Sequence, residues 1–391
     1  MSKYQDVTWK NNDKLKLLII VGTRPEIIRL SEVIKKSRQY FDVILAHTGQ
    51  NYDYNLNGIF FHDLSLDEPE VYLNAVGEHL GETMGNIISE SYDLMSTIKP
   101  DAVLVLGDTN SCLSVIGAKR LHIPIFHMEA GNRSKDECLP EETNRRIVDI
   151  ISDVNMAYSE HARKYLADTG LPKERTYVTG SPMAEVLRAN LNKIEASEIH
   201  QKLDLQKGHY ILLSAHREEN IDTDKNFLSL FNAVNKMAEK YDMPILYSCH
   251  PRSRNKLEST GFKLDARVIQ HEPLGFHDYN NLQMNAYAVV SDSGTLPEES
   301  SFFTSIGKPI SAVCIRTSTE RPEALDKGAF VLSGIDEKGL LQAVEVAVEM
   351  NKNNHLGIPV PDYVDENVSD KVVKIIQSYT NIVNKMVWRK D

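Results

Sequence analysis

The chain has 391 residues, a length that predicts two domains, and its 41% of hydrophobic and 25% of charged residues are ordinary for a globular protein. Lysine and arginine number 44 against 55 aspartates and glutamates, and this net charge of −11 argues against nucleic acid or an anionic membrane as partner. The N-terminal residues are polar, and no apolar run approaches the roughly 18 residues of a membrane span. We therefore expect a cytoplasmic protein.

Short apolar runs alternate with helix-like stretches in the first half of the chain. The runs are nearly continuous in apolar residues, as strands covered on both faces of a parallel sheet should be. Strands are predicted at Leu15–Val21, Val43–His47, Ala102–Leu106 and Ile123–His127, and helices at Glu26–Tyr40, Leu80–Ile98 and Ser111–Leu121. This alternation predicts a doubly wound α/β domain.

The same rhythm restarts after Thr179. Strands are predicted at Tyr210–Ser214, Pro244–Ser248, Val268–Ile269 and Ala286–Ser291, and helices at Asn226–Tyr241, Tyr279–Asn285 and Pro297–Ile306. The stretch from Leu187 to Gly208 is charged and poor in strand formers, so we place a domain boundary there. We expect two Rossmann-like domains, 1–187 and 188–369, with a helix within 370–391 packing back on the first.

Open parallel sheets bind ligands at the carboxyl ends of their strands, so the residues after each strand are the candidates for a functional site. Arg24 opens a helix, where a cation is unfavourable unless an anion lies nearby. Glu129 follows a strand without any capping reason, whereas Asp108 is equally well explained as an N-cap. Farther along, Glu141 and Arg145 have the spacing of an i, i+4 ion pair.

The second half has its own polar strand ends. His216 and His250 each follow a strand and each has an arginine within two residues, which predicts a diphosphate or leaving-group site. The loop Asp292–Glu299 joins a buried strand to a helix through a Ser-Gly-Thr turn, with capping-box spacing between Thr295 and Glu298. Free N–H groups there would face an anion, so this loop is the predicted phosphate site.

Several familiar sites are missing from the sequence. It has no dinucleotide fingerprint, no P-loop, no nucleophile elbow and no metal-ligand spacing. We therefore expect no metal and no cofactor. The carboxylates, histidines and arginines at the strand ends suit acid–base chemistry on a ligand that carries a phosphate leaving group.

Ten segments in this order resemble the non-hydrolysing UDP-N-acetylglucosamine 2-epimerase family. They are GTRPEIIR at 22–29, TGQN at 48–51, GDTNS at 107–111, EAGNR at 129–133, PEETNR at 140–145, TGSP at 179–182, HREEN at 216–220, HPR at 250–252, DSGTLPEE at 292–299 and TERPE at 319–323. The resemblance implies a GT-B-like α/β fold with the active site in the cleft between two Rossmann-like domains. It also implies a UDP-2-acetamido sugar as substrate and a homodimer.

The resemblance also implies roles for individual residues. The acid–base carboxylates of the family correspond to Asp108, Glu129 and Glu141, and His216 would assist the departure of UDP. Substrate-binding positions correspond to Arg24, Arg29, Gln50, Arg145, His250, Tyr279, Ser293, Gly294, Thr295, Glu299 and Arg321. Among these, Arg145 could also hold Glu141, Glu299 would bind the ribose and Tyr279 would face the uracil.

Four residues depart from the pattern of many family members. Where many members have lysine, this chain has Arg29, and where they have leucine it has Asn132. Glu218 replaces their arginine, and Thr295 replaces their glycine. With these departures the chain resembles the capsule and O-antigen enzymes that make UDP-N-acetyl-L-fucosamine from UDP-2-acetamido-2,6-dideoxy-β-L-talose. UDP-N-acetylglucosamine remains an alternative substrate. A GT-B glycosyltransferase, a nucleotide-sugar-binding module and a hydrolysing epimerase are the alternative functions.

Overall fold

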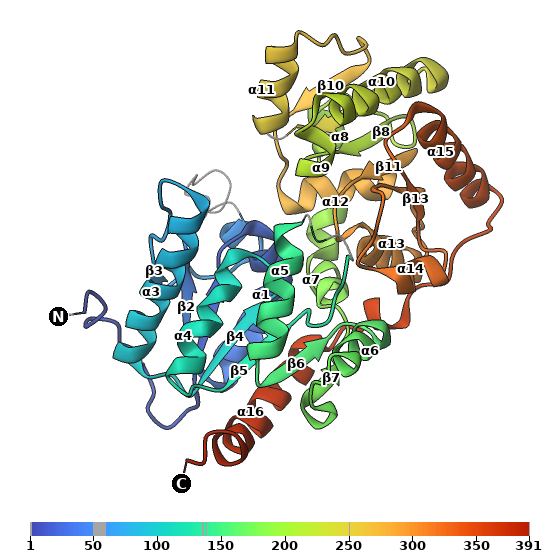
Figure 1. Ribbon diagram of the computed structural model, residues 1–391. Helices are drawn as coiled ribbons and strands as arrows, with labels where there is room; N and C mark the ends of the chain where they lie inside the picture. The colour runs from blue at the N-terminus through green and yellow to red at the C-terminus, as the bar shows by residue number, and fades with distance from the viewer. Residues whose placement is uncertain (1, 50–59, 135–136, 138, 250, 391) are drawn as a thin grey trace. The chain divides into compact units, whose positions relative to one another are not determined.

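The computed structural model describes residues 2–49, 60–134, 137, 139–249 and 251–390 (Figure 1). The chain divides into two compact units. The first comprises Met1–Val186 together with Asp365–Asp391, and the second comprises Leu187–Val364. Each unit is described by itself, and the cleft expected between them stays a prediction.

The first unit is built on a parallel sheet with the strand order β3-β2-β1-β4-β5-β6-β7. Its strands are β1 Lys16–Val21, β2 Asp42–His47, β3 Val71–Tyr72, β4 Ala102–Leu106, β5 Ile125–Met128, β6 Val154–Ala157 and β7 Thr176–Val178. Its helical segments are α1 Arg24–Tyr40, α3 Leu80–Ile98, η1 Asn110–Ser114, α4 Val115–Arg120, α5 Pro140–Ile151, α6 Glu160–Asp168, η2 Lys173–Arg175 and α16 Val368–Met386. The central strands are fully buried, as their unbroken apolar sequences predict.

The C-terminal helix α16 packs against α1 of the first unit. Lys36 of α1 forms an ion pair with Asp370, at 2.9 Å between Nζ and Oδ1. The backbone N–H of Ser369 donates to Glu185 at 2.8 Å. The helix α7, Met183–Glu195, runs across the boundary between the units and into the stretch in which the sequence predicts a domain boundary.

The second unit repeats the architecture with a parallel sheet in the order β10-β9-β8-β11-β12-β13. Its strands are β8 Ile211–Ser214, β9 Ile245–Ser248, β10 Val268–His271, β11 Ala288–Ser291, β12 Ala312–Ile315 and β13 Val331–Ser333. Its helical segments are α8 Ile199–Lys202, α9 Glu218–Ile221, α10 Asp224–Tyr241, α11 Pro251–Thr260, α12 Phe276–Asn285, α13 Leu296–Ser305, α14 Pro322–Asp326, α15 Glu337–Lys352 and η3 Pro361–Tyr363. Helices α10 and α15 cover one face and bury an apolar core that includes Phe231 and Val344.

Each sheet has a topological switch point. The chain moves outward from β1 to β2 and then returns to place β4 on the other side of β1. In the second unit, β11 likewise lies beside β8 on the side away from β9. Ligands of open α/β sheets bind where the strand order reverses. The loops after β1, β4, β8 and β11 are therefore the places to look for a site.

The predicted doubly wound α/β class is confirmed, and the differences are local. The helix expected over Ser111–Leu121 is divided into η1 and α4. The strands β3, β6, β7, β12 and β13 lie outside the predicted set, because runs this short do not stand out from their surroundings in the sequence. In the described part of the chain, no helix is both long and apolar enough to cross a membrane.

Candidate active site

The loop after β1 is organised by the buried carboxylate of Glu26. Its Oε2 accepts hydrogen bonds from the backbone N–H of Gly22 at 3.1 Å and from the hydroxyl of Thr23 at 2.8 Å, while its Oε1 accepts from the hydroxyl of Ser111. Burial raises the pKa of Glu26, although these hydrogen bonds oppose the shift. Thr23 occupies the N-cap position of α1, but its hydroxyl donates to Glu26 and caps no backbone N–H. Glu26 thus ties the loop after β1 to the loop after β4.

Two arginines of α1 face the rim of the first sheet. Arg24 is the first residue of the helix, and its guanidinium carbon lies 5.3 Å from the centre of the Phe60 ring. Arg29 follows more than one turn later and forms an ion pair with Glu129, 100 residues away in the sequence. A cation from one element thereby holds a carboxylate from another.

The loop after β4 presents Asp108, which forms an ion pair with Arg145 of α5. Arg145 also lies 3.3 Å from the Oε2 atom of Glu142. The structure pairs Arg145 with Asp108 and Glu142, and the pairing of Arg145 with Glu141 stays a prediction. Glu141 lies half-buried in the first turn of α5.

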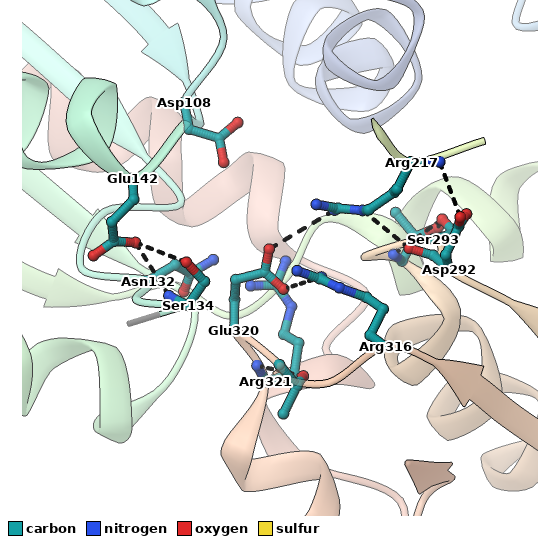
Figure 2. A network of polar contacts seen from close by, with 12 residues as sticks. Asp108, Asn132, Ser134, Glu142, Arg217, Asp292, Ser293, Arg316, Glu320 and Arg321 are labelled. Carbon is teal, nitrogen blue, oxygen red and sulfur yellow. Dashed lines mark hydrogen bonds and ion pairs between the residues drawn. The ribbon is translucent and has the colours of Figure 1, made fainter. Parts of the chain in front are cut away.

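Glu142, in the first turn of α5, holds a neighbouring loop through its carboxylate. It is 1% exposed, and its Oε2 accepts hydrogen bonds from the backbone N–H and the hydroxyl of Ser134 at 3.1 and 3.2 Å. Figure 2 shows the carboxylate of Glu142 directed at Ser134. The arginine that holds Asp108 is therefore itself held by a carboxylate that anchors a neighbouring loop.

Glu129 directly follows β5 and has the left-handed backbone conformation, with φ of 62°. A non-glycine residue adopts this conformation at a cost, and such residues cluster at functional sites. Its carboxylate contacts Arg29 through Oε2 and the side-chain amide of Asn132 through Oε1, the latter at 3.2 Å. The carboxylate is thus fixed from two directions.

In the second unit Asp292, the first residue after β11, is completely buried. Its Oδ2 accepts hydrogen bonds from the backbone N–H groups of His216 and Arg217, both at 2.9 Å, and from the side chain of Asn220 at 3.1 Å. Its Oδ1 lies 3.2 Å from Nδ1 of His216, whose side chain is 43% exposed. Asp292 thereby joins the loops after β8 and β11 and orients an accessible imidazole.

The Ser-Gly-Thr turn leads into α13. The hydroxyls of Ser293 and Thr295 lie 2.9 Å apart, and the Thr295 hydroxyl donates to Oε1 of Glu299 at 2.9 Å. Gln283 donates to Oε2 of the same carboxylate at 2.7 Å. A Cβ atom on Gly294 would lie 3.5 Å from the Arg217 guanidinium, so the turn and this cation are close neighbours.

The predicted capping box between Thr295 and Glu298 is wrong. The Glu298 carboxylate is completely buried and pairs with Arg321 at 3.2 Å, because the helix turns this side chain inward. Burial opposes the charge of Arg321, but the neighbouring carboxylates, first among them Glu298, raise its pKa above the ordinary value. Arg321 thus stabilises the fold of its loop.

A second ion cluster follows β12. Arg316 is buried and pairs with Glu320 at 2.5 Å and with Glu219 at 3.2 Å. Figure 2 shows Arg217 and Arg316 both directed at Glu320, with Arg217 3.7 Å from it. Two arginines that share the carboxylate of Glu320 give this rim two fixed cationic groups.

Three more of the predicted substrate-binding residues are Tyr279, Gln50 and His250. Tyr279 lies half-buried on α12 against a cluster that includes Tyr210 and Leu282, and burial raises the pKa of its phenol. Gln50 and His250 lie outside the described residues. Among the residues that the structure describes, no group of three or more His, Cys, Asp or Glu side chains is placed to hold a metal ion.

Comparison with known proteins identifies the family. The model of the family described as UDP-N-acetylglucosamine 2-epimerase matches residues 34–377. The chain belongs to the UDP-N-acetylglucosamine 2-epimerase family. It is thus an isomerase, a non-hydrolysing C2 epimerase of UDP-sugars, and the family predicted from the sequence is confirmed.

Three relatives of this epimerase are informative. The solved UDP-N-acetylglucosamine 2-epimerase of Rickettsia bellii is 42% identical, with 96% of this chain and 100% of that chain covered at a TM-score of 0.88. The Methanocaldococcus jannaschii UDP-GlcNAc 2-epimerase, solved in complex with UDP-GlcNAc and UDP, is 32% identical, with 93% and 100% covered at a TM-score of 0.85. The UDP-2,3-diacetamido-2,3-dideoxy-D-glucuronate 2-epimerase of Pseudomonas aeruginosa is 33% identical over 85% of this chain and 92% of its own. These matches confirm the GT-B-like α/β fold of the epimerase.

Sequence reasoning missed three side chains that organise the epimerase site. Asp292 directly follows a buried strand and Asp108 comes two residues after one, and this shared position at the end of a strand is the signal that could have found Asp292. Arg316 also directly follows a strand, β12, but that strand lies outside the predicted set. Glu142 gave no comparable signal, since its partner Ser134 lies in a loop whose folding the sequence does not reveal.

Proposed function

We propose that this epimerase converts UDP-2-acetamido-2,6-dideoxy-β-L-talose to UDP-N-acetyl-L-fucosamine for capsule or O-antigen polysaccharide. The observation that carries the substrate assignment is the position of the residues that depart from the common family pattern. Arg29 and Asn132 both contact the carboxylate of Glu129. Thr295, a third departure, contacts Glu299. Two of the four altered residues therefore lie at a carboxylate of the proposed acid–base set, where a different sugar would change the contacts.

The reaction proceeds by elimination and re-addition. The C2 proton of a 2-acetamido sugar has no neighbouring carbonyl to acidify it, so simple proton exchange is too slow. A base takes this proton, the C2–H electrons form the C1=C2 double bond, and the C1–O bond breaks to release UDP. UDP then adds back to C1 of the resulting 2-acetamidoglycal, and a proton is delivered to the opposite face of C2. Atoms and charge balance without an additional reactant.

The carboxylates of the first unit supply the proton transfers. Asp108 and Glu129 are each held by an arginine from a different helix, Arg145 and Arg29. Two separately oriented carboxylates suit a reaction that removes a proton from one face and returns it to the other. Glu141, in the first turn of α5, is the third candidate.

The second unit binds the nucleotide. His216, oriented by Asp292, assists the departure of UDP by donating to the leaving phosphate. Ser293 and Gly294 lie just before the N-terminus of α13, where free N–H groups and the helix dipole favour an anion. Glu299 is oriented by two hydrogen bonds and accepts from the ribose hydroxyls.

Substrate preference tests this proposal. We expect kcat/KM for the 6-deoxy-L-talosamine nucleotide to exceed that for UDP-N-acetylglucosamine by about 10²-fold. The double variant Arg29→Lys with Asn132→Leu should reduce this preference, because it changes both contacts of Glu129. Arg38→Lys is the matched control, since Arg38 lies on the same helix and pairs with Glu70. Turnover of the gluco sugar alone would contradict the substrate assignment.

The alternative substrate is UDP-N-acetylglucosamine, which the Rickettsia and Methanocaldococcus relatives carry in their names. The Pseudomonas relative supports a wider substrate range within the family, because it is named for a different UDP-sugar. A cytoplasmic location and a homodimer are also part of the proposal, and the homodimer rests on the resemblance alone.

A further inference from the structure

The turn that carries Glu129 is held in a demanding backbone conformation. Glu129 has φ of 62° and Gly131 has φ of 82°. A Cβ atom on Gly131 would lie 2.4 Å from the carbonyl oxygen of Ala162, so the turn also packs closely against α6. Such a turn keeps its shape only where its surroundings fix it.

The carboxylate of Asp149 on α5 provides much of this fixation, and it is 1% exposed. Its Oδ1 accepts a hydrogen bond from the backbone N–H of Gly131 at 3.1 Å, and its Oδ2 lies 2.7 Å from a guanidinium nitrogen of Arg133. Arg133 in turn donates to the carbonyl oxygen of Asn132 at 2.7 Å. Every residue from 131 to 133 is therefore tied to Asp149, directly or through one contact.

The same carboxylate is connected to the loop that carries Asp108. His127 of β5 is completely buried, and its Nδ1 lies 3.2 Å from Oδ1 of Asp149. Its Nε2 lies 2.8 Å from the carbonyl oxygen of Gly107, the residue before Asp108. Because a carbonyl oxygen only accepts, Nε2 carries the proton of this hydrogen bond. The imidazole thus lies between the two loops, hydrogen-bonded to Gly107 and packed against Asp149 without a hydrogen bond at Nδ1.

We infer that Asp149 is a positioning residue of the epimerase, which fixes Glu129 through its turn and, through His127, fixes that turn relative to Asp108. The inference rests on the proposed acid–base roles of Glu129 and Asp108. General acid–base catalysis depends on placing the carboxylate within hydrogen-bond reach of the proton. A displacement of about 1 Å is enough to lower turnover by about 10²-fold.

Another buried aspartate provides the matched control. Asp153 accepts a hydrogen bond from the backbone N–H of Ile125 at 3.0 Å and pairs with Lys119 at 2.6 Å. It therefore also links the end of α5 to β5, but at the first residue of the strand, whereas Glu129 follows the last. A purely structural role predicts similar effects of Asp149→Asn and Asp153→Asn on activity.

The experiment measures kcat and KM of the full-length epimerase with whichever UDP-sugar the wild type converts. We expect Asp149→Asn to lower kcat by about 10-fold or more with KM changed less than about 3-fold. Asp153→Asn should keep the wild-type kcat for each folded molecule, with the folded fraction taken from circular dichroism. Wild-type kcat in Asp149→Asn would overturn the inference, as would an equal loss in both variants.

A double-variant cycle separates this inference from the proposed function. If Asp149 acts through Glu129, then Glu129→Gln with Asp149→Asn should be no slower than Glu129→Gln alone. Independent, additive losses would overturn the inference. Wild-type turnover in Glu129→Gln would instead overturn the proposed role of Glu129. If Asp149→Asn fails to fold, Arg133→Gln replaces it. This change removes one contact of Asp149 and leaves its hydrogen bond with Gly131. An unchanged kcat in Arg133→Gln would overturn the inference.

Discussion

In the first unit arginines hold the carboxylates of the rim, whereas in the second unit buried carboxylates hold arginines and backbone N–H groups. Asp108 and Glu129 each accept one guanidinium from another element. Asp292, by contrast, accepts two backbone N–H groups. Glu320 is shared between the two arginines 217 and 316. The same α/β fold thus holds the charges at the strand ends of its two units in different ways.

The difference matches two kinds of chemistry. A carboxylate oriented by a cation is placed to exchange protons with a ligand. Arginines and N–H groups that carboxylates have already oriented are placed to receive an anion such as a diphosphate. An epimerase that eliminates and re-adds UDP needs both kinds of site, and we propose that the two units divide them.

The largest expected effect is on turnover. Asp108→Asn and Glu129→Gln should each lower kcat by ~10²-fold or more, since each removes a positioned acid or base. UDP should still bind, because the nucleotide contacts belong to the second unit. His216→Ala should also lose most turnover. Rates would be measured by NMR or by coupled assay, and UDP binding by calorimetry.

Asp101→Asn is the control for the carboxylate variants. Asp101 precedes β4 as Asp108 follows it, and it accepts a hydrogen bond from the backbone N–H of Lys16 at 2.8 Å. Its replacement should leave turnover unchanged. Near-normal turnover in Asp108→Asn, Glu129→Gln or His216→Ala would remove that residue from the mechanism.

The next effect is on stability and concerns the buried ion pair of the second unit. Arg321→Leu should lower the free energy of unfolding by about 3–5 kcal/mol, because it leaves the carboxylate of Glu298 buried without its cation. Arg254→Leu is the control, since Arg254 pairs with the exposed Glu272 and should cost at most about 1 kcal/mol. Equal losses in chemical denaturation would contradict a structural role for Arg321.

A histidine of the first unit sharpens the comparison with His216. His47 ends β2, is 2% exposed, and accepts the backbone N–H of Gly49 at 2.9 Å through Nδ1. Burial lowers the pKa of His47 to about 4. Between pH 4 and about 6.5 the unfolded chain binds a proton that the folded chain does not, so the free energy of unfolding falls as the pH falls.

The loss expected from His47 is at most about 3 kcal/mol by pH 4. Denaturation curves at a series of pH values would measure it, and His47→Gln should flatten that part of the profile. An unchanged profile in this variant would mean that His47 is not the group responsible.

The smallest expected effect concerns Thr295. Thr295→Gly removes one hydrogen bond to Glu299, which contributes about 0.5–1.5 kcal/mol, so the dissociation constant for UDP should rise a few-fold. Thr295→Ser keeps the hydroxyl and should bind UDP as the wild type does. Calorimetry would separate the two variants, and equal affinity in both would contradict the proposed role of this hydrogen bond.

Much of the fold follows from sequence, because long apolar strands such as β1 and β4 stand out from their surroundings. The loop positions of Asp108 and His216 follow as well, since parallel strands collect their carboxyl ends at one edge. The contacts that these residues make cannot be predicted from the sequence. Asp292 lies 76 residues from His216 along the chain, and nothing local encodes that contact.

Backbone conformation is the other feature that sequence could not provide. The left-handed conformation of Glu129 is unexpected for a glutamate, since Asn, Asp and Gly favour it. It arises from the contacts around the turn, including those of Gly131 with Asp149 and Ala162. Tertiary contacts decide this residue against its local preference.

Proton NMR of the epimerase in D₂O, supplied with the 6-deoxy-L-talosamine nucleotide, tests the central claim most directly. The account predicts that the fuco isomer appears with deuterium at C2 and that UDP remains attached in the product. Isomer formation without deuterium at C2 would contradict elimination and re-addition, and no reaction with this nucleotide while UDP-N-acetylglucosamine is epimerised would contradict the substrate assignment.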